Sequence, residues 1–100
     1  MAETYFVAVS PHNYNSTTVG LAATIQVSAA IPNFLITEYF MNMDAFGKEV
    51  AVQPFEVING YIDLPETPGL GIDLDEEALA RYPYQPGHPR SVLQYSDEGP

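Results

Sequence analysis

Two polar stretches, each at the end of a short apolar run, constrain the fold of this chain most. The run Tyr5–Val9 leads into a loop that carries His12, and the run Phe34–Ile36 leads directly to Glu38 after one threonine. Between the runs, Thr17–Ala30 has apolar residues at helical spacing. This order predicts a strand, a helix and a second strand that is parallel to the first, because a connection of this length permits the right-handed crossover. The sequence therefore predicts an α/β fold.

The helix is expected to pack on the two strands through small side chains, which permit a close approach to a sheet. Ser16 or Thr17 is available as the cap at its amino end. The predicted apolar face consists of Val19, Ala22, Ala23, Val27 and Ala30. Gly20 within this helix costs about 1 kcal/mol relative to alanine, which indicates either close packing or an approaching ligand.

The rest of the chain divides by composition into an extension and a tail. Residues 1–46 are predicted to form the βαβ unit, residues 47–82 an irregular carboxyl-terminal extension, and residues 83–100 a flexible tail rich in Pro, Gly, Ser and Gln. Tyr39–Phe46 is expected to be irregular. The extension is predicted to contain short strands and one short helix, at Val50–Val52, Phe55–Ile58, Tyr61–Leu64 and Glu76–Tyr82, with a turn at Asn59-Gly60.

The charge of the chain excludes some partners. Three basic residues stand against 13 acidic ones, for a formal net charge of −10. Nucleic-acid binding requires clustered Lys and Arg, and an anionic membrane surface also attracts basic segments, so neither partner is expected. The chain has no cysteine and no apolar run near the roughly 20 residues of a membrane span, and a cytoplasmic location is expected.

Four polar residues are candidates for chemistry. An imidazole at His12 can exchange a proton near neutral pH, and the alternative is a loop histidine that only bonds the backbone. Glu38 lies at the edge of buried structure, where a charge is costly unless it is paired or used; the alternative is a salt-bridged or exposed strand-end acid. The amides of Asn13 and Asn15 suit sugar hydroxyls because they both donate and accept, although asparagine in loops more often serves turn geometry.

An acidic cluster near the predicted second helix does not indicate a metal site. The cluster lacks the order of a calcium loop, and charge at a helix amino end explains it. No metal ligand is therefore predicted in this chain. Its members are Asp73, Asp75, Glu76 and Glu77.

Taken in order, five segments resemble the carboxyl-terminal end of the mandelate racemase/muconate lactonizing enzyme branch of the enolase superfamily. The likeness covers about residues 5–82 and is closest to the acid-sugar dehydratases of the galactonate type. The segments are Ser10-Pro11-His12-Asn13, Gly20-Leu21-Ala22-Ala23, Ile31-Pro32-Asn33-Phe34-Leu35-Ile36-Thr37-Glu38, Asn59-Gly60-Tyr61-Ile62 and Pro65-Glu66-Thr67-Pro68-Gly69-Leu70-Gly71-Ile72.

The resemblance implies a partial (β/α) barrel, in which His12 ends the seventh strand and Glu38 ends the eighth. It implies that His12 is a general acid or base and that Glu38 hydrogen-bonds the carboxylate or enolate of an acid-sugar substrate. In the family, Mg²⁺ stabilises the enediolate formed when the proton next to the carboxylate is removed. The magnesium ligands and the lysine base of the family match no residue here, so no cofactor is expected for this chain alone.

The length of the chain sets two functional hypotheses. A complete eight-stranded barrel needs roughly 250 residues, whereas this chain has 100. We expect a carboxyl-terminal fragment of a dehydratase or racemase that is inactive alone and that associates with itself or with the missing barrel segments, because a lone βαβ unit leaves strand edges unpaired. The alternative is a stand-alone interaction or self-assembly module without catalysis.

Overall fold

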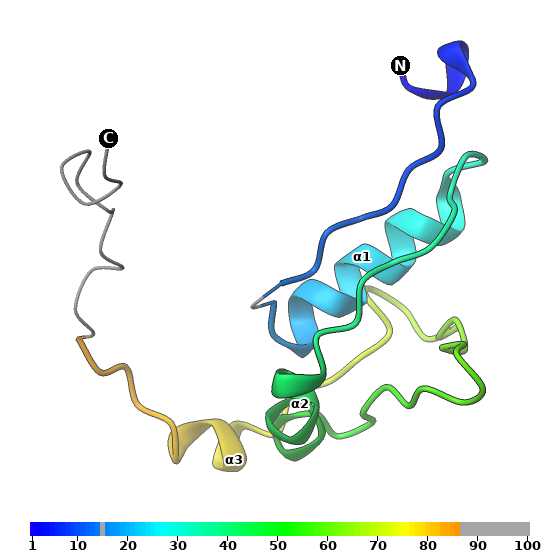
Figure 1. Ribbon diagram of the computed structural model, residues 1–100. Coiled ribbons are helices and arrows are strands. Elements are labelled where there is room, and N and C mark those ends of the chain that lie inside the picture. Colours follow the sequence, from blue (N-terminus) through cyan, green and yellow to red (C-terminus); the bar gives the residue numbers. More distant parts are fainter. Residues whose placement is uncertain (15, 87–100) are drawn as a thin grey trace, which may run out of the picture.

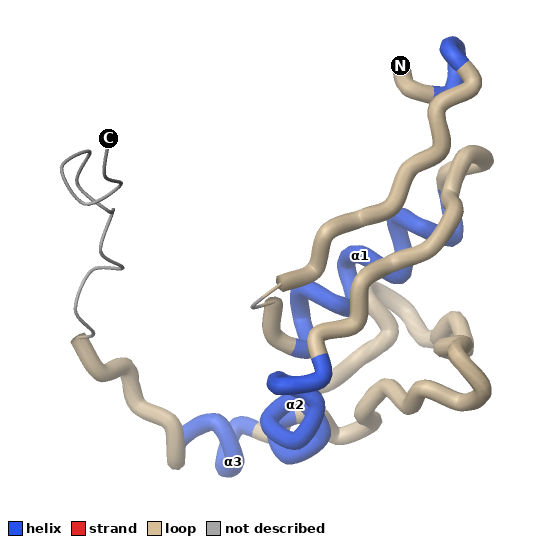
Figure 2. Tube along the Cα trace, viewed as in Figure 1, coloured by secondary structure: helices blue, strands red, loops and turns tan. Residues whose placement is uncertain are grey.

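The computed structural model describes residues 1–14 and 16–86 (Figure 1). Asn15 and the part of the predicted tail from residue 87 onward lie outside the described residues. Within the described part, the helices are joined by extended segments and loops, and the extended segments meet only in isolated β-bridges (Figure 2). The helical elements are η1 (Glu3–Tyr5), α1 (Thr18–Ala30), η2 (Met41–Met43), α2 (Asp44–Val50) and α3 (Glu76–Ala80).

Two extended segments run side by side in parallel, one from the amino end of the chain and one after α1 (Figure 1). Val9 and Phe34 form a parallel bridge, in which the N–H of Val9 donates to the carbonyl of Asn33 at 2.8 Å and the N–H of Leu35 donates to the carbonyl of Val9 at 2.9 Å. The side-chain amide of Asn33 adds a bond to the carbonyl of Val7 at 2.7 Å. The predicted parallel pairing is therefore present.

The predicted strands at Tyr5–Val9 and Phe34–Ile36 are wrong in extent. Residues Glu3–Tyr5 form a 3-10 turn, and Phe6 adopts a left-handed conformation with φ of 56°. Within the described residues, the pairing of the two segments is one bridge rather than a continuous ladder. A pair of extended segments without further neighbours is only marginally stable, which explains why little regular strand forms.

Helix α1 lies where it was predicted, but its buried face differs. Of the five residues predicted to face the strands, only Ala22 is buried. The helix is apolar or small on nearly every side, so spacing alone did not select the face. Thr17 occupies the cap position without a side-chain hydrogen bond. In the described part of the chain, no helix has the length and apolar character needed to cross a membrane. The buried face consists of Thr18, Leu21, Ala22, Ile25 and Ser28.

Helix α2 was not predicted. The irregular segment expected over Tyr39–Phe46 contains η2 and the start of α2, and the strand expected at Val50–Val52 is instead the end of α2 followed by one antiparallel bridge between Ala51 and Leu74. Asp44 in the first turn and Lys48 in the last turn suit the helix dipole and form an i,i+4 ion pair at 3.0 Å. Because α2 is short and contains Gly47, its helical pattern in the sequence is weak.

The later elements follow the prediction more closely. Helix α3 begins at the cap Asp75, whose carboxylate accepts the N–H of Ala78 at 2.9 Å. The expected strands at 55–58 and 61–64 reduce to one antiparallel bridge between Ile58 and Tyr61. Asn59 and Gly60 turn the chain between them, with φ of 53° and 83° respectively. Positive φ at both positions is the geometry of the tight hairpin turn that Asn-Gly predicts.

The core lies between α1 and the segments that cover it. Leu21, Ala22, Ile25 and Phe55 form the buried cluster, against which three half-buried side chains pack, those of Tyr39, Ile62 and Ile72. Tyr39 directly follows Glu38, so the end of the second extended segment is tied to the core.

Candidate active site

The ends of the two extended segments meet at the predicted site. Beyond the bridge, the N–H of Glu38 donates to the carbonyl of Pro11 at 3.2 Å, and the hydroxyl of Thr37 donates to the same oxygen at 3.3 Å. Because the segments are parallel, their carboxyl ends lie at one edge. These two bonds place Glu38 opposite the loop that carries His12.

His12 and Glu38 contact each other through their side chains. The Nε2 atom of His12 lies 3.4 Å from Oε2 of Glu38, an ion-pair distance when the imidazole is protonated. The side chain of His12 is 80% exposed and that of Glu38 is 39% exposed. Both side chains are therefore accessible to a ligand.

Asn13 holds Glu38 through its backbone. Its N–H donates to Oε2 of Glu38 at 2.9 Å, so the same carboxylate oxygen faces both Asn13 and His12. A hydrogen bond from a backbone amide to a carboxylate is charge-assisted and stronger than a bond between neutral groups. Glu38 is therefore fixed from the loop of the first segment, although the predicted amide contact with a substrate would have used the side chain of Asn13.

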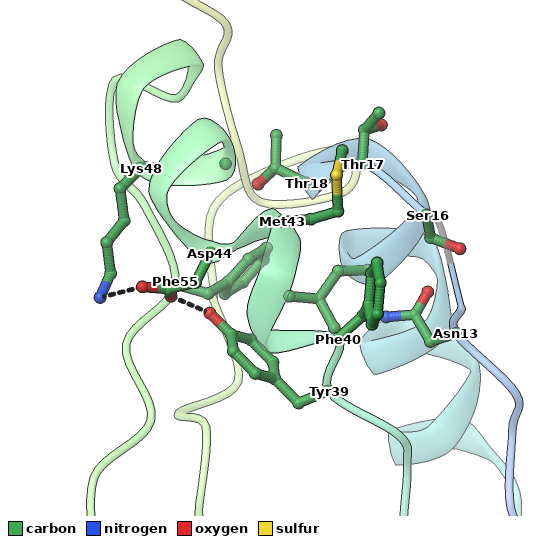
Figure 3. Close-up of a pocket in the computed structure, with 12 residues that line it drawn as sticks. Asn13, Ser16, Thr17, Thr18, Tyr39, Phe40, Met43, Asp44, Lys48 and Phe55 are labelled. Carbon is green, nitrogen blue, oxygen red and sulfur yellow. Dashed lines mark hydrogen bonds and ion pairs between the residues drawn. The ribbon is translucent and has the colours of Figure 1, made fainter.

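The side chain of Asn13 is only 3% exposed, and its Oδ1 atom finds no hydrogen-bond partner among the described residues. It lines a cavity of about 30 Å³ that lies between the start of α1 and α2, together with Thr18 and Phe55 (Figure 3). This volume suits one or two water molecules rather than an acid sugar. Asn15, the other predicted substrate ligand, lies outside the described residues.

Aromatic rings border the His12–Glu38 pair. The ring of Tyr14 stacks near His12, with centroids 6.2 Å apart and planes 24° apart. The ring of Phe40 also contacts that of Tyr14, with a centroid distance of 4.6 Å. The rings join the loop after the first segment to the residues after the second segment, and they give one flank of the site an apolar surface.

A polar network begins at Tyr39, the residue that follows Glu38. The phenol of Tyr39 donates to Oδ1 of Asp44, and Oδ2 of Asp44 pairs with Nζ of Lys48 at 3.0 Å (Figure 3). Burial and the neighbouring carboxylate raise the pKa of Tyr39 to about 12. The hydrogen bond from Tyr39, followed by the contact with Lys48, lowers the pKa of Asp44. The phenol is thus held as a donor and the carboxyl as an acceptor over the neutral range.

The described residues do not fit a magnesium site. Residues 1–14 and 16–86 contain no group of three or more His, Asp or Glu side chains arranged to hold a metal ion. In the acidic cluster near α3, the carboxylate of Asp75 instead caps the helix. The arrangement at His12 and Glu38 offers proton exchange and hydrogen bonding by the chain's own groups.

The structure brings together His12 and Glu38, which the sequence named separately as candidates, because the ends of the two parallel segments share an edge. Tyr39, Asp44 and Lys48 were not predicted as part of the site region. The i,i+4 spacing of Asp44 and Lys48 was a usable signal for a helix there, but nothing in the sequence linked that helix to Tyr39.

A pair of parallel extended segments joined by a crossover helix defines an α/β protein. Residues 1–78 match the enolase C-terminal domain-like family. The chain belongs to this family, within the mandelate racemase/muconate lactonizing enzyme branch of the enolase superfamily.

Similar proteins are named as acid-sugar dehydratases. The chain is 36% identical over 89 residues to a D-galactonate dehydratase family member of Streptomyces bingchenggensis, a match that covers 88% of this chain and 21% of the relative. It is 37% identical over 79 residues to the D-xylonate dehydratase of Haloferax volcanii, covering 79% of this chain and 19% of the relative. The chain thus spans about one fifth of the length of these curated relatives.

Solved structures agree with this placement. A structure of the mandelate racemase/muconate lactonizing enzyme type from Burkholderia SAR-1 superposes with a TM-score of 0.80 at 40% identity, over 88% of this chain and 22% of that one. An enolase of the mandelate racemase subgroup from Agrobacterium tumefaciens gives a TM-score of 0.67 at 31% identity, over 81% of this chain and 21% of that one. The α/β fold class is that of these neighbours.

Proposed function

We propose that this chain is the carboxyl-terminal part of the catalytic barrel of an acid-sugar dehydratase, with His12 and Glu38 in its active site. The observation that carries the proposal is the 3.4 Å contact between these side chains, which are 26 positions apart in the sequence and lie at the parallel carboxyl edge. The names of the dehydratase relatives support the substrate class. On this proposal, the two extended segments are the seventh and eighth strands of a partial barrel.

In the proposed reaction, His12 protonates the departing hydroxyl of the acid sugar. Its high exposure supports this role, because the imidazole is accessible to a ligand that enters above the edge. A racemase would use the same residue to move the proton next to the carboxylate. A bound substrate would replace the His12–Glu38 contact with contacts of its own, so the apo geometry represents the resting pair.

Glu38 is proposed to hydrogen-bond the carboxylate or the enolate of the substrate. The backbone N–H of Asn13 fixes one carboxyl oxygen, Oε2, and leaves Oε1 for the ligand. Preorganised groups of this kind act on charge that develops during the reaction and cost no reorganisation at that moment. Of the two asparagines named from the sequence, Asn13 is buried, so only Asn15 stays a proposed substrate contact.

Magnesium belongs to the proposed parent enzyme rather than to the described residues. Its ligands, and the lysine base that the resemblance implies, would come from polypeptide other than this chain. We propose that the chain alone is inactive toward acid sugars. Incubation with D-galactonate or D-xylonate and Mg²⁺ is expected to give no dehydration product, and metal-dependent product from the pure chain would contradict the proposal.

A chimera tests the site directly. The matching end of the D-xylonate dehydratase of Haloferax volcanii is replaced by this chain, and dehydration of D-xylonate is measured in the presence of Mg²⁺. His12→Ala is expected to lower kcat by about 100-fold to 10,000-fold, the usual contribution of a general acid. The matched control is His88→Ala, which removes the chain's other histidine. Equal activity of the two variants would contradict the role of His12.

Glu38→Gln in the same chimera keeps the shape of the side chain but removes its charge. We expect a loss of kcat with a smaller change in KM if Glu38 acts mainly on the enolate, since such contacts strengthen in the transition state. Glu66→Gln, at an exposed position, is the control.

The source DNA upstream of Met1 provides an independent test, in which an open frame that encodes a lysine-bearing strand and three spaced carboxylates is expected.

A further inference from the structure

We propose that Tyr39 is a positioning residue that fixes the backbone at Glu38 and so holds its carboxylate on the loop of His12 and Asn13. The inference deepens the proposed function, because it names the contact that keeps the pair in register. Tyr39 touches neither His12 nor a substrate position in this proposal. It acts through its neighbour in the chain.

The contacts of three consecutive side chains support this role. Glu38 contacts the loop of the first segment, and Phe40 contacts Tyr14 of that same loop. The ring of Tyr39, between them, packs against the core cluster of α1 and Phe55. Three consecutive residues of this segment are therefore held by contacts with other parts of the chain.

The backbone alone does not hold this segment. Among the described residues, the last backbone bond to the first segment is that from Glu38 to Pro11, and the next backbone bond is the local one from Met43 to Phe40. Tyr39 lies in the gap between them. Its fixation rests on the packing of its ring and on the hydrogen bond of its phenol.

The far end of Tyr39 is anchored to a helix. Its phenol donates to Asp44 in the first turn of α2, and Asp44 is held in turn by Lys48 one turn later (Figure 3). Helix α2 itself is fixed through Val50, which is 1% exposed. A continuous series of contacts thus links α2, through Asp44 and Tyr39, to the backbone of Glu38.

The test compares Tyr39→Phe with Tyr61→Phe in the intact chain. Both remove one phenol, but Tyr61 is exposed and lies on the hairpin. Amide hydrogen exchange is measured by NMR at Asn13 and at Ile25 in the core of α1. Tyr39→Phe is expected to raise the exchange rate of Asn13 by about tenfold relative to that of Ile25, because the bond to the Glu38 carboxylate opens more often. Tyr61→Phe is expected to change neither.

A merely structural role for Tyr39 would raise exchange at Asn13 and Ile25 together, and this result would overturn the proposal. Rescue gives a second readout. Asp44→Asn keeps an acceptor for the phenol, whereas Asp44→Ala removes it, so only Asp44→Ala is expected to reproduce the effect of Tyr39→Phe at Asn13. Equal effects of the two variants at Asn13 would also overturn the proposal.

A double-mutant cycle separates this inference from the proposed function. Glu38→Gln is expected to change the NMR chemical shift of the Asn13 amide proton, because this proton bonds to the Glu38 carboxylate. The change is expected to be about half as large in the Tyr39→Phe background. An unchanged shift would refute positioning by Tyr39 without touching the catalytic role of Glu38. A chimera in which His12 does not support dehydration would refute the proposed function. It would leave the NMR evidence for positioning by Tyr39 unaffected.

Discussion

Two helical glycines, Gly20 and Gly47, meet different surroundings. A Cβ atom added at Gly20 would lie 2.8 Å from Cβ of Ser16, closer than real Cβ contacts allow. A Cβ atom added at Gly47 would lie 3.6 Å from Cβ of Thr18, an ordinary contact. Of the two explanations that the sequence left for Gly20, the structure supports close packing of the site loop on α1.

This contrast gives a matched pair of predictions. Gly47→Ala is expected to stabilise the chain by about 1 kcal/mol through helix propensity alone. Gly20→Ala gains the same propensity but forces Ser16 to move, and overpacking costs about 1–3 kcal/mol, so its net effect is expected to be neutral or destabilising. Urea unfolding of both variants checks the difference, and equal stabilisation would contradict the packing at Gly20.

The raised pKa of Tyr39 predicts a loss of stability in alkali. The folded pKa of about 12 lies above the ordinary value of 10.0, so the folded state binds this proton more tightly than the unfolded state. The contribution is complete below pH 10 and is lost as the pH rises to about 12. Thermal unfolding at several pH values is expected to show a shallower decline for Tyr39→Phe than for Tyr61→Phe, and identical declines would contradict the buried phenol.

His12 and Glu38 were predictable as neighbours from the sequence, because the period and length of the runs around them define two parallel strand ends. Tyr39 was not predictable in the same way. Its partner Asp44 belongs to a helix with only a weak signal in the sequence, and nothing in the sequence links that helix to Tyr39.

The secondary-structure elements show where local sequence was sufficient. Helix α3 was predicted because acids at its start and the cap are local signals. Helix α2 was missed because seven residues with a central glycine carry a weak pattern. The strands were overestimated because their ladders depend on neighbours that a sequence window does not contain.

The cap of α3 gives the prediction for this element. The carboxylate of Asp75, and not that of Asp73, makes the bond to Ala78. Asp75→Ala is expected to lower the local stability of α3 by about 1 kcal/mol. Asp73→Ala is the control, since Asp73 uses only its backbone carbonyl, which accepts from Val52 at 2.9 Å. Amide exchange at Leu79 distinguishes them, and equal protection would contradict the assigned cap.

Helices α2 and α3 are also joined through Glu49. One carboxylate oxygen accepts from Arg81 at 2.8 Å and the other from the phenol of Tyr82, whose ring meets Phe46 edge-on at 5.0 Å. The hydrogen bond from Tyr82 to Glu49 raises the pKa of Tyr82. Exposed ion pairs contribute little to global stability, so the contacts of Glu49 orient the short α3 rather than stabilise the whole chain.

At the level of the whole molecule, the pair of extended segments is uncovered. Leu35 is 68% exposed and Ile36 is 61% exposed, on a segment bridged at one edge only within the described residues. Contiguous exposed apolar surface of this kind marks an interaction site.

The exposed pair of extended segments predicts self-association of the isolated chain. Sedimentation velocity over a range of concentrations is expected to show reversible association, because unpaired edges and apolar faces pair with other copies. Leu35→Lys is expected to weaken it by at least about tenfold. Tyr84→Lys changes the charge equally at an 89% exposed site beyond α3 and serves as the control. A chain that stays monomeric at high concentration would contradict this prediction.

The hairpin turn at Asn59-Gly60 is a suitable place to insert a label. It lies at the tip of a loop, and a Cβ atom placed on Gly60 would meet no atom within 4 Å. Exposed tips of this kind tolerate insertions well. A short peptide epitope or a fluorophore attachment site inserted there would leave the His12–Glu38 edge untouched, so the chain can be immobilised or followed in mixtures while that edge stays open to ligands.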